Sequence, residues 1–145
     1  MSDQYDLVVI GGGPGGYVAA LRAAQLGMKV AVVEKRAALG GTCLNEGCIP
    51  SKALLDSSEY FALARDSFKS HGILIDPPRL DLKQMMKRKD EVVVRLTRGI
   101  ASLFKKHDIR LATGTGRLLK GEGTLQVAVT TADGEQTLTG RRVLL

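Results

Sequence analysis

Two cysteines, Cys43 and Cys48, are the residues of this chain whose type and spacing most clearly allow chemistry. They are its only cysteines, and four residues separate them within the segment Gly40–Lys52. Such a pair can bind a metal, form a structural disulfide, or cycle between dithiol and disulfide. Zinc usually takes four ligands, and neither histidine lies nearby in sequence. A structural bridge is typical of secreted mini-domains and stabilises little across so short a loop. The redox interpretation is therefore favoured, and no metal site is expected.

A bridge between these cysteines requires a distorted backbone. Residues five positions apart in a regular α-helix have Cα atoms about 8.7 Å apart, whereas a disulfide needs less than about 7 Å. Gly47 supplies the freedom to distort, and Pro50 suits the first turn of a helix that follows. A helix N-terminus and the cation of Lys52 would both favour a thiolate here.

A glycine-rich turn near the N-terminus follows a pattern typical of dinucleotide binding. The β-branched apolar run Tyr5–Ile10 predicts a strand buried on both faces. Gly11–Gly16 follows at once, residues 17–26 have helical spacing, and 29–34 form a second apolar run that ends in an acid. G-x-G-x-x-G alone is weak in a chain with 17 glycines. Between a strand and a helix, with a second strand beyond, it predicts a dinucleotide-binding unit.

Each part of this unit has an expected task. Gly11 would make the tight turn, Gly13 would let the backbone approach a pyrophosphate, and Gly16 would let the helix pack close to the strand. The pyrophosphate would rest on the helix N-terminus, where free N–H groups favour anions. Glu34 lies 18 residues after Gly16 and would accept hydrogen bonds from an adenosine ribose. Its carboxylate disfavours a ribose 2′-phosphate, an inference that the neighbouring cations Lys35 and Arg36 weaken.

The position of the cysteine segment favours FAD over NAD as the ligand of this unit. The segment begins six residues after Glu34, so a cofactor bound at Gly11–Gly16 could extend its far end toward the cysteines. A flavin can exchange electrons directly with a dithiol. A nicotinamide passes hydride and has no simple direct exchange with a disulfide.

The middle of the chain predicts two helices. One runs from Ser51 to about Phe68, with a broad apolar face. A loop over residues 70–78 follows, and Asp81 is the expected N-cap of a second helix of some 25 residues. This second helix would be about 37 Å long.

The last part predicts a strand over 108–113 and then a small antiparallel meander. Its expected strands are 117–120, 124–130 and 136–139. The expected turns are 114–116, 121–123 and 132–134. Residues 142–145 start another apolar strand in which the chain stops, so we expect a fragment. The predicted fold class is α/β: a Rossmann-like FAD-binding domain with a parallel sheet, flanking helices and a small antiparallel β meander.

Composition excludes several classes of protein. The chain has 44% hydrophobic and 25% charged residues, as in an ordinary globular domain. No apolar run approaches the length of a membrane span, and the acidic N-terminus is not a signal or transit sequence. We therefore expect no membrane association and a cytoplasmic location. The net charge is +6, much of it between Lys83 and Lys106. Without a nucleic-acid motif, that charge is interpreted as a solvated helix surface.

Taken together, these residues resemble the class I flavoprotein disulfide reductases, and within that class the dihydrolipoamide dehydrogenase family. The most specific part is the run Gly-Gly-Thr-Cys-Leu-Asn-Glu-Gly-Cys-Ile-Pro-Ser-Lys-Ala-Leu-Leu, from Gly40 to Leu55. Glutathione reductase-like members tend to carry Lys where this chain has Ser51. Mercuric reductase-like members tend to have Val where it has Ile49. Glu46 is a departure, because the family more often has Val there.

The resemblance implies a role for each site residue. Cys43 would be the interchange thiol, Cys48 the thiolate against the flavin, and Lys52 a neighbour of the reactive edge of the isoalloxazine. The expected FAD contacts, besides these three, are Gly11, Gly13, Pro14, Gly15, Gly16, Glu34, Lys35, Gly41, Thr42 and Gly116.

The resemblance also implies an activity for the whole enzyme. It would oxidise protein-bound dihydrolipoamide through the disulfide and FAD to reduce NAD⁺, as a homodimer serving 2-oxo acid dehydrogenase complexes through their lipoyl domains. Residues 1–145 would be its FAD-binding domain, truncated before the NAD-binding and dimer-interface domains. The family's acid–base histidine belongs to the last of these, and His71 and His107 are expected to be surface residues. The fragment alone is expected to be inactive.

Two alternatives remain at this point. One is a related reductase of the mercuric or glutathione type. The other is a non-catalytic dinucleotide-binding redox sensor whose cysteines report redox state.

Overall fold

Six strands form one sheet, in the order β3-β2-β1-β6-β5-β4. The computed structural model describes residues 4–120 and 123–145. The strands are β1 (Gln4–Ile10), β2 (Val30–Glu34), β3 (Arg110–Thr113), β4 (Thr115–Leu118), β5 (Leu125–Thr131) and β6 (Gly134–Leu144). The helices are α1 (Pro14–Gln25), α2 (Gly41–Asn45), α3 (Cys48–Asp66), the 3₁₀ helix η1 (Phe68–His71) and α4 (Leu82–Lys106).

The parallel half of the sheet holds the predicted dinucleotide-binding unit. β1 pairs in parallel with β2, from Leu7 opposite Val30 to Ile10 opposite Val33. All five residues of β2 are buried, as expected for an apolar strand with neighbours on both sides. Because β1 and β2 end at the same edge, the glycine turn after Ile10 and the acid Glu34 are brought together there.

The predicted division of the last strands is wrong. The segment 136–139 and residues 142–144 of the segment 142–145, which were expected as separate strands, belong to one strand, β6. Its first part pairs antiparallel with β5, and its second part pairs in parallel with β1. Gly140, which lies between the two predicted segments, is a strand residue packed on β1. A Cβ added there would lie 2.9 Å from Cγ2 of Val8, so the glycine serves close packing and not a turn.

The turns of the meander are shorter than predicted. Gly114 alone makes the bend after β3, and Thr115 and Gly116 already belong to β4. The expected turn 121–123 includes residues 121 and 122, which lie outside the described residues. A hairpin turn is present where 132–134 was predicted, but it consists of residues 132 and 133, because Gly134, at a φ of 128°, is already the first residue of β6.

Two apolar cores cover the faces of the parallel strands. One joins β1 and β2 to the helices and contains Val9, Ala20, Val32, Leu44, Ile100 and Phe104. The other joins β1, β2 and β3 to the meander and contains Tyr5, Val8, Val33, Ala112, Val129 and Leu138. The sheet is thus sandwiched between helices and its own folded-over antiparallel part. The Rossmann-like α/β class predicted from the sequence is confirmed.

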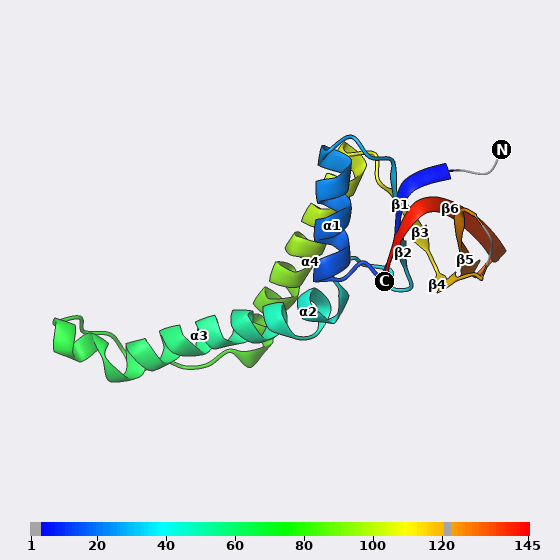
Figure 1. Ribbon diagram of the computed structural model, residues 1–145. Helices are drawn as coiled ribbons and strands as arrows, with labels where there is room; N and C mark the ends of the chain where they lie inside the picture. Colours follow the sequence, from blue (N-terminus) through cyan, green and yellow to red (C-terminus); the bar gives the residue numbers. More distant parts are fainter. Residues whose placement is uncertain (1–3, 121–122) are drawn as a thin grey trace.

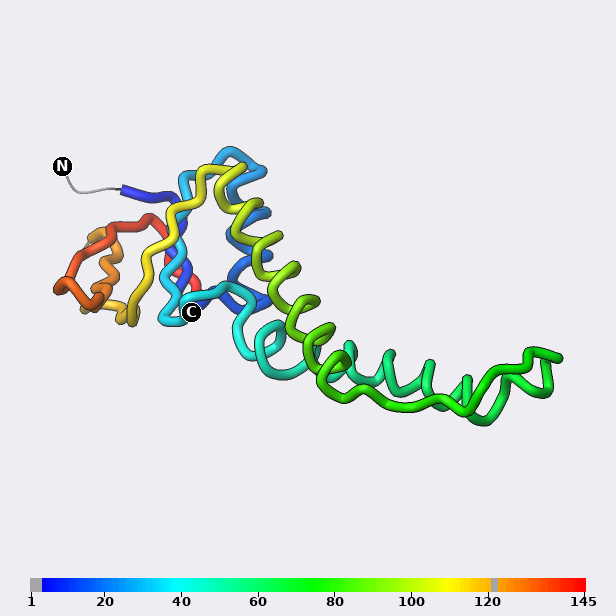
Figure 2. The backbone as a smooth tube through the Cα atoms, turned by 180° about the vertical axis from the view of Figure 1, so that it is seen from behind, coloured from blue at the N-terminus to red at the C-terminus, as the bar shows by residue number. Residues whose placement is uncertain are grey.

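The helix α3 projects from this body as an arm (Figures 1 and 2). Residues 72–81 return alongside it, and α4 leads back to the sheet next to α1. The predicted cap of α4 is confirmed, since the Asp81 side chain accepts a hydrogen bond from the N–H of Gln84. The broad apolar face predicted for α3 is not packed as a core face. Ala53 is its one buried residue, and Leu55 is 65% exposed.

Among the described residues, no helix is both long and apolar enough to cross a membrane.

Candidate redox and cofactor site

The two cysteines lie on either side of a break between two helices. Cys43 belongs to the short helix α2, and Cys48 is the first residue of α3. Between them the backbone leaves helical geometry, with Gly47 at φ −111° and ψ −100°. The distortion expected from the disulfide geometry is therefore present. It places Cys48 at the N-terminus of a 19-residue helix.

Both thiols are free, and their side chains interact. The hydrogen bond to the Cys48 side chain is the largest cause that raises the pKa of Cys43, and burial and the charge of Cys48 add to it. The backbone of Cys48 and the cation of Lys52 act in the opposite direction, with less effect. In the dithiol state, therefore, the surroundings of Cys43 favour its thiol, although Lys52 was expected to favour a thiolate. Cys43 is half-buried, and Cys48 is exposed.

The glycine turn has the close approaches that its sequence predicts. Gly11 has a φ of 108°, a conformation that side chains rarely allow, and its N–H donates to the carbonyl of Val33. A Cβ on Gly16 would lie 1.9 Å from the carbonyl oxygen of Gly11, which no rearrangement of side chains could relieve. Gly16 is thus required for α1 to pack against the end of β1.

The N-terminus of α1 points to an anion site. The helix begins at Pro14, and its N-cap Gly13 supplies no side-chain hydrogen bond. The first N–H groups of a helix have no acceptor within it, so those of Gly15 and Gly16 remain available to a ligand. At Gly13, the one atom within 4 Å of an added Cβ would be Cα of Gly41.

Glu34 is buried at the end of β2 and already accepts two hydrogen bonds. One carboxylate oxygen accepts from the N–H of Gly12 at 2.7 Å, and the other from the N–H of Arg36 at 2.9 Å. A carboxylate oxygen has two acceptor positions, so each oxygen keeps one for a ligand hydroxyl. Glu34 therefore has a structural task that the sequence did not suggest, besides the ribose contact expected of it.

A pocket of about 400 Å³ opens at this edge of the sheet. Six of the residues expected to contact a cofactor line it: Gly11, Glu34, Lys35, Gly41, Thr42 and Gly116. It also contains residues that sequence reasoning did not assign, among them Arg36, Gly114 and Thr115. A Cβ on Gly116 would come within 3.0 Å of Ile10 and 3.1 Å of Val33. A side chain at this position of the pocket wall would therefore require Ile10 and Val33 to shift by a few tenths of an ångström.

A second pocket, of about 260 Å³, lies on the other side of the glycine turn. Its lining includes Gly15, Gly16 and Leu144, and it shares Gly11 and Ile10 with the first pocket. Two pockets that meet at the N-terminus of a helix suit an extended ligand with a central pyrophosphate. The residues present thus fit the adenosine and pyrophosphate parts of FAD. Gly13, Pro14, Cys43, Cys48 and Lys52 line neither pocket.

Arg36 connects the first pocket to the cysteine segment. Its guanidinium lies 2.5 Å from the carboxylate of Glu46 and 3.5 Å from Oγ1 of Thr42. The ion pair lowers the pKa of Glu46 and raises that of Arg36. Glu46, the departure from the family pattern, is thus neutralised by a neighbour. The sequence signal for this ion pair was the opposite charge of Arg36 and Glu46, which lie on either side of Gly40 and Gly41.

The remaining titratable candidates lie away from the site. His71 belongs to η1 at the far end of the arm and is exposed, and His107 follows α4 and is half-buried. No group of three or more possible metal ligands gathers within the described ranges.

Comparison with known proteins gives a consistent result. Residues 5–145 match the model of a family described as pyridine nucleotide-disulphide oxidoreductase. The mitochondrial dihydrolipoyl dehydrogenase of Pisum sativum is 50% identical over 145 residues, which are 99% of this chain and 28% of that protein. Dihydrolipoyl dehydrogenase 3 of Pseudomonas aeruginosa is 57% identical over 135 residues, 92% of this chain and 28% of that protein.

A solved structure shows the same fold. LpdA of Mycobacterium tuberculosis superposes with a TM-score of 0.84 at 24% identity, over 97% of this chain and 30% of that one. The chain thus spans a little under a third of the length of the proteins that it matches.

Proposed function

Because this chain belongs to the pyridine nucleotide-disulphide oxidoreductase family, we propose that it is the FAD-binding, dithiol-bearing part of a dihydrolipoyl dehydrogenase. Residues 1–145 form the FAD-binding domain, and the NAD-binding and dimer-interface domains belong to the remainder of the protein. The observation that carries this proposal is the interacting pair of free thiols at the break between α2 and α3. One residue before Cys43, Thr42 lines the pocket at the end of β2.

The cofactors of this part and of the whole protein are FAD and NAD. The N-terminus of α1 would hold the pyrophosphate, Glu34 the ribose, and the wall around Gly116 the adenine. Cys48 and Lys52 would contact the far end of the cofactor. When bound, FAD supplies a two-electron acceptor that reoxidises the dithiol, and NAD⁺ is the final acceptor.

The sulfur chemistry is a pair of thiol–disulfide exchanges. A thiolate of the substrate dithiol attacks Sγ of Cys43 in the oxidised protein, a new S–S bond forms, and the Cys43–Cys48 bond breaks. Cys48 leaves as a thiolate at the N-terminus of α3. The second substrate thiolate then attacks the substrate sulfur of the mixed disulfide and releases Cys43. The substrate leaves as a cyclic disulfide, oxidised by two electrons, and the protein pair is reduced by two.

The surroundings of Cys43 act once it has been released. A raised pKa slows its departure as a thiolate, but the hydrogen bond to Cys48 and burial then favour the thiol, so the released Cys43 takes up a proton. A protonated Cys43 does not attack the product, which discourages the reverse reaction. The raised pKa thus favours release of the oxidised substrate.

The substrate is a dihydrolipoamide group on a lipoyl domain of a 2-oxo acid dehydrogenase complex. The whole protein works as a homodimer. The proposal includes a cytoplasmic location, and the similar proteins named above come from a mitochondrion and from a bacterium. The proposed function involves neither nucleic acid nor a membrane.

The decisive measurement is NAD⁺ reduction by dihydrolipoamide, with the protein at its full natural length. The proposal predicts turnover with dihydrolipoamide and at least about 100-fold less with glutathione or mercuric ion under matched conditions. Cys43→Ser and Cys48→Ser should each abolish turnover while FAD remains bound, because serine cannot form the disulfide. The Cys48 variant should also lose the long-wavelength absorbance of the reduced enzyme.

Each competing function gives a different result. Higher turnover with glutathione or mercuric ion would assign the protein to that branch of the family. Undiminished NAD⁺ reduction in a protein carrying both Cys43→Ala and Cys48→Ala would make the cysteines sensors and refute the catalytic role.

A further inference from the structure

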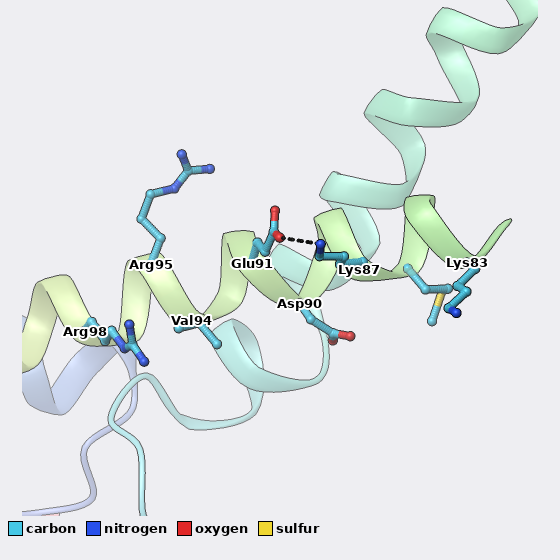
Figure 3. A pocket seen from close by; sticks show the side chains of 8 residues that line it. Lys83, Lys87, Asp90, Glu91, Val94, Arg95 and Arg98 are labelled. Carbon is cyan, nitrogen blue, oxygen red and sulfur yellow. Dashed lines mark ion pairs between the residues drawn. The ribbon is translucent and has the colours of Figure 1, made fainter. Parts of the chain in front are cut away.

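The ion pair between Arg36 and Glu46 joins two different segments of the chain. Arg36 follows the end of β2, and Glu46 lies ten positions further on, between the two cysteines. Some other ion pairs stay within one helix. Lys87 and Glu91, for example, lie on successive turns of α4, at the rim of a hollow of about 770 Å³ (Figure 3). A pair of that kind holds no second segment in place, whereas the pair of Arg36 with Glu46 does.

The arginine of this pair stands on a fixed base. The N–H of Arg36 donates to Oε1 of Glu34 at 2.9 Å, and Glu34 is buried at the end of β2. The other oxygen of the same carboxylate accepts from the N–H of Gly12. The backbone of Arg36 is thus tied to the sheet, and its side chain extends from there toward the cysteine segment.

The guanidinium contacts both ends of the segment that separates the cysteines. One nitrogen lies 2.5 Å from the carboxylate of Glu46, and the other donates to Oγ1 of Thr42 at 3.5 Å. Thr42 directly precedes Cys43, and Glu46 comes two residues before Cys48. The planar fork of an arginine suits two such contacts at once. We call the three residues Arg36, Thr42 and Glu46 the Arg36 clamp.

The other contacts of this segment hold its first half better than its second. Nδ2 of Asn45 donates to the carbonyls of Leu39 and Gly41, at 3.2 and 2.8 Å, which ties α2 to the chain before it. In the second half, the N–H groups of Glu46 and of the glycine after it donate to the carbonyl of Thr42. Those two bonds stay within the segment. The clamp connects its second half to the end of β2.

The clamp should matter more in the dithiol form than in the disulfide form. A disulfide between Cys43 and Cys48 closes the segment into a ring and holds its ends together without help. In the dithiol form the thiols are free, and they stay in contact only while the segment keeps its shape. A contact that restricts the segment therefore raises the effective concentration of one thiol at the other.

We propose that the Arg36 clamp positions the redox pair and thereby lowers the reduction potential of the Cys43–Cys48 couple. Arg36 is a positioning residue, because it acts on the thiols through Glu46 and Thr42. This inference rests on the proposed function, in which the two cysteines form a disulfide. By linkage, the disulfide strengthens the ion pair as much as the ion pair favours the disulfide. Glu46 thus has a task that a valine at this position could not perform.

The alternative is a direct effect of the two charges on the thiols. The pKa of Cys43 is shifted by Cys48, by burial and by Lys52, whereas the clamp places a cation and an anion side by side, so that their fields largely cancel. A direct effect would also change sign between variants. Loss of the Arg36 cation would disfavour thiolates and lower the potential, and loss of the Glu46 carboxylate would favour thiolates and raise it. Loss of the clamp raises the potential in both cases.

Redox titration of the protein at its full natural length, with FAD bound and without oxygen or NAD⁺, tests the clamp. In buffers of reduced and oxidised dithiothreitol, the protein S–S bond breaks as the cyclic S–S bond of the reagent forms, and the two thiol protons of the reagent pass to Cys43 and Cys48. Alkylation and mass spectrometry give the dithiol fraction. Arg36→Gln and Glu46→Gln should each favour the dithiol about fivefold, a modest effect because the ion pair is partly exposed. For a two-electron couple this is a rise of about 20 mV.

Further variants separate the ion pair from its single charges. The protein with both glutamines should show the same fivefold change as either single variant, because one substitution already breaks the pair. Glu46→Val should give this change as well. Arg36→Lys should give a smaller one, since an ammonium lacks the fork that reaches both partners. Arg141→Gln is the matched control: it removes an arginine that lies 3.4 Å from Asp6, between β6 and β1, and should leave the potential unchanged.

Three results would overturn the inference. They are unchanged potentials in Arg36→Gln and Glu46→Gln, shifts of opposite sign in these two variants, and shifts that add in the double variant. NAD⁺ reduction by dihydrolipoamide, measured on the same preparations, keeps this failure apart from that of the proposed function. An active original protein whose variants keep its potential refutes the clamp alone. An original protein that forms no disulfide between Cys43 and Cys48 in these buffers refutes the proposed function and the clamp together.

Discussion

The carboxylate of Glu34 accepts a hydrogen bond of 2.7 Å from the backbone N–H of Gly12, across the gap between β2 and the glycine turn. The second oxygen accepts from the N–H of Arg36, the residue that also pairs with Glu46. One buried side chain therefore fixes the end of β2 to the turn after β1 and to the segment that leads to the cysteines. Its effect on cofactor binding is consequently both direct and structural.

Glu34→Gln should destabilise the protein even without a ligand. A glutamine has one acceptor oxygen, so its NH₂ group would face one of the two backbone N–H groups that Glu34 now satisfies. A buried donor left without a partner costs about 1–3 kcal/mol. We expect the free energy of unfolding, measured in urea, to fall by this amount, and FAD retention to fall with it. Glu135→Gln, at an exposed site, is the control. A stable variant that loses only FAD would show that Glu34 acts on the ligand alone.

The glycines at 15 and 16 should respond very differently to alanine. A Cβ at Gly16 would lie 1.9 Å from the carbonyl oxygen of Gly11, whereas a Cβ at Gly15 would have no atom within 4 Å. Gly16→Ala forces α1 away from β1, and we expect it to cost about 3 kcal/mol or more. Gly15→Ala should leave the free energy of unfolding within about 0.5 kcal/mol of the original value. Similar losses of unfolding free energy in both variants would contradict the assignment of the constraint to the close contact between Gly16 and Gly11.

The glycine turn shows how much the sequence could reveal. An apolar strand, three spaced glycines, a helix and a second strand predicted the parallel unit correctly, because each feature is a local requirement of one backbone path. The helix break between the cysteines was also predictable. Five helical positions keep two Cα atoms too far apart for a disulfide, and Gly47 was the residue able to relieve this.

Features that depend on distant segments were not predictable. Gly140 looks like an interruption, and only its packing against Val8 of β1 explains a glycine inside a continuous strand. The hydrogen bond from Gly12 to Glu34 joins residues 22 positions apart. The apolar residues of α3 have helical spacing, but periodicity does not tell whether a partner surface exists, and Leu55 remains 65% exposed.

Arg88 should control the rigidity of the α3 arm. From α4 its guanidinium donates to the carbonyl of Ala53 at 2.9 Å and to the hydroxyl of Ser57 at 3.1 Å, and it pairs with Asp56 at 2.5 Å. Removing it in Arg88→Leu deletes every one of these links between the helices. Amide hydrogen exchange along α3 should speed up about fivefold or more, while exchange in β1 and β2 stays the same, because local opening does not need global unfolding.

The matched change for Arg88 is Lys87→Leu, one position along α4, where the lost partner is Glu91 of the same helix. It should leave exchange in α3 unchanged. Equal acceleration in both variants would show that helix charge, and not the contact between α3 and α4, sets the rigidity of the arm.

The ionisation of Cys43 should depend on two neighbours, Cys48 and Lys52, that shift its pKa in opposite directions. The Cys48 side chain is the largest cause that raises the pKa of Cys43, burial adds to it, and Lys52 lowers it. Cys48→Ala should therefore lower the pKa of Cys43, and Lys52→Met should raise it further. Cys48→Ser keeps a hydrogen-bonding side chain, so it should lower the pKa less than Cys48→Ala does. The measurement is the rate of alkylation at Cys43, followed by mass spectrometry as the pH is raised.

The same shift predicts how the stability of the reduced protein depends on pH. Because the folded state raises the pKa of Cys43, the unfolded chain loses this proton first as the pH rises. The Cys43 contribution to stability is therefore complete below the ordinary pKa of a thiol, and it is lost as the pH rises through the raised value. Cys48→Ala should flatten this alkaline decline, whereas Lys52→Met should steepen it. If stability declined equally with pH in the original protein, Cys48→Ala and Lys52→Met, another group would be titrating. The thiol pair would then not set the alkaline limit of the reduced protein's stability.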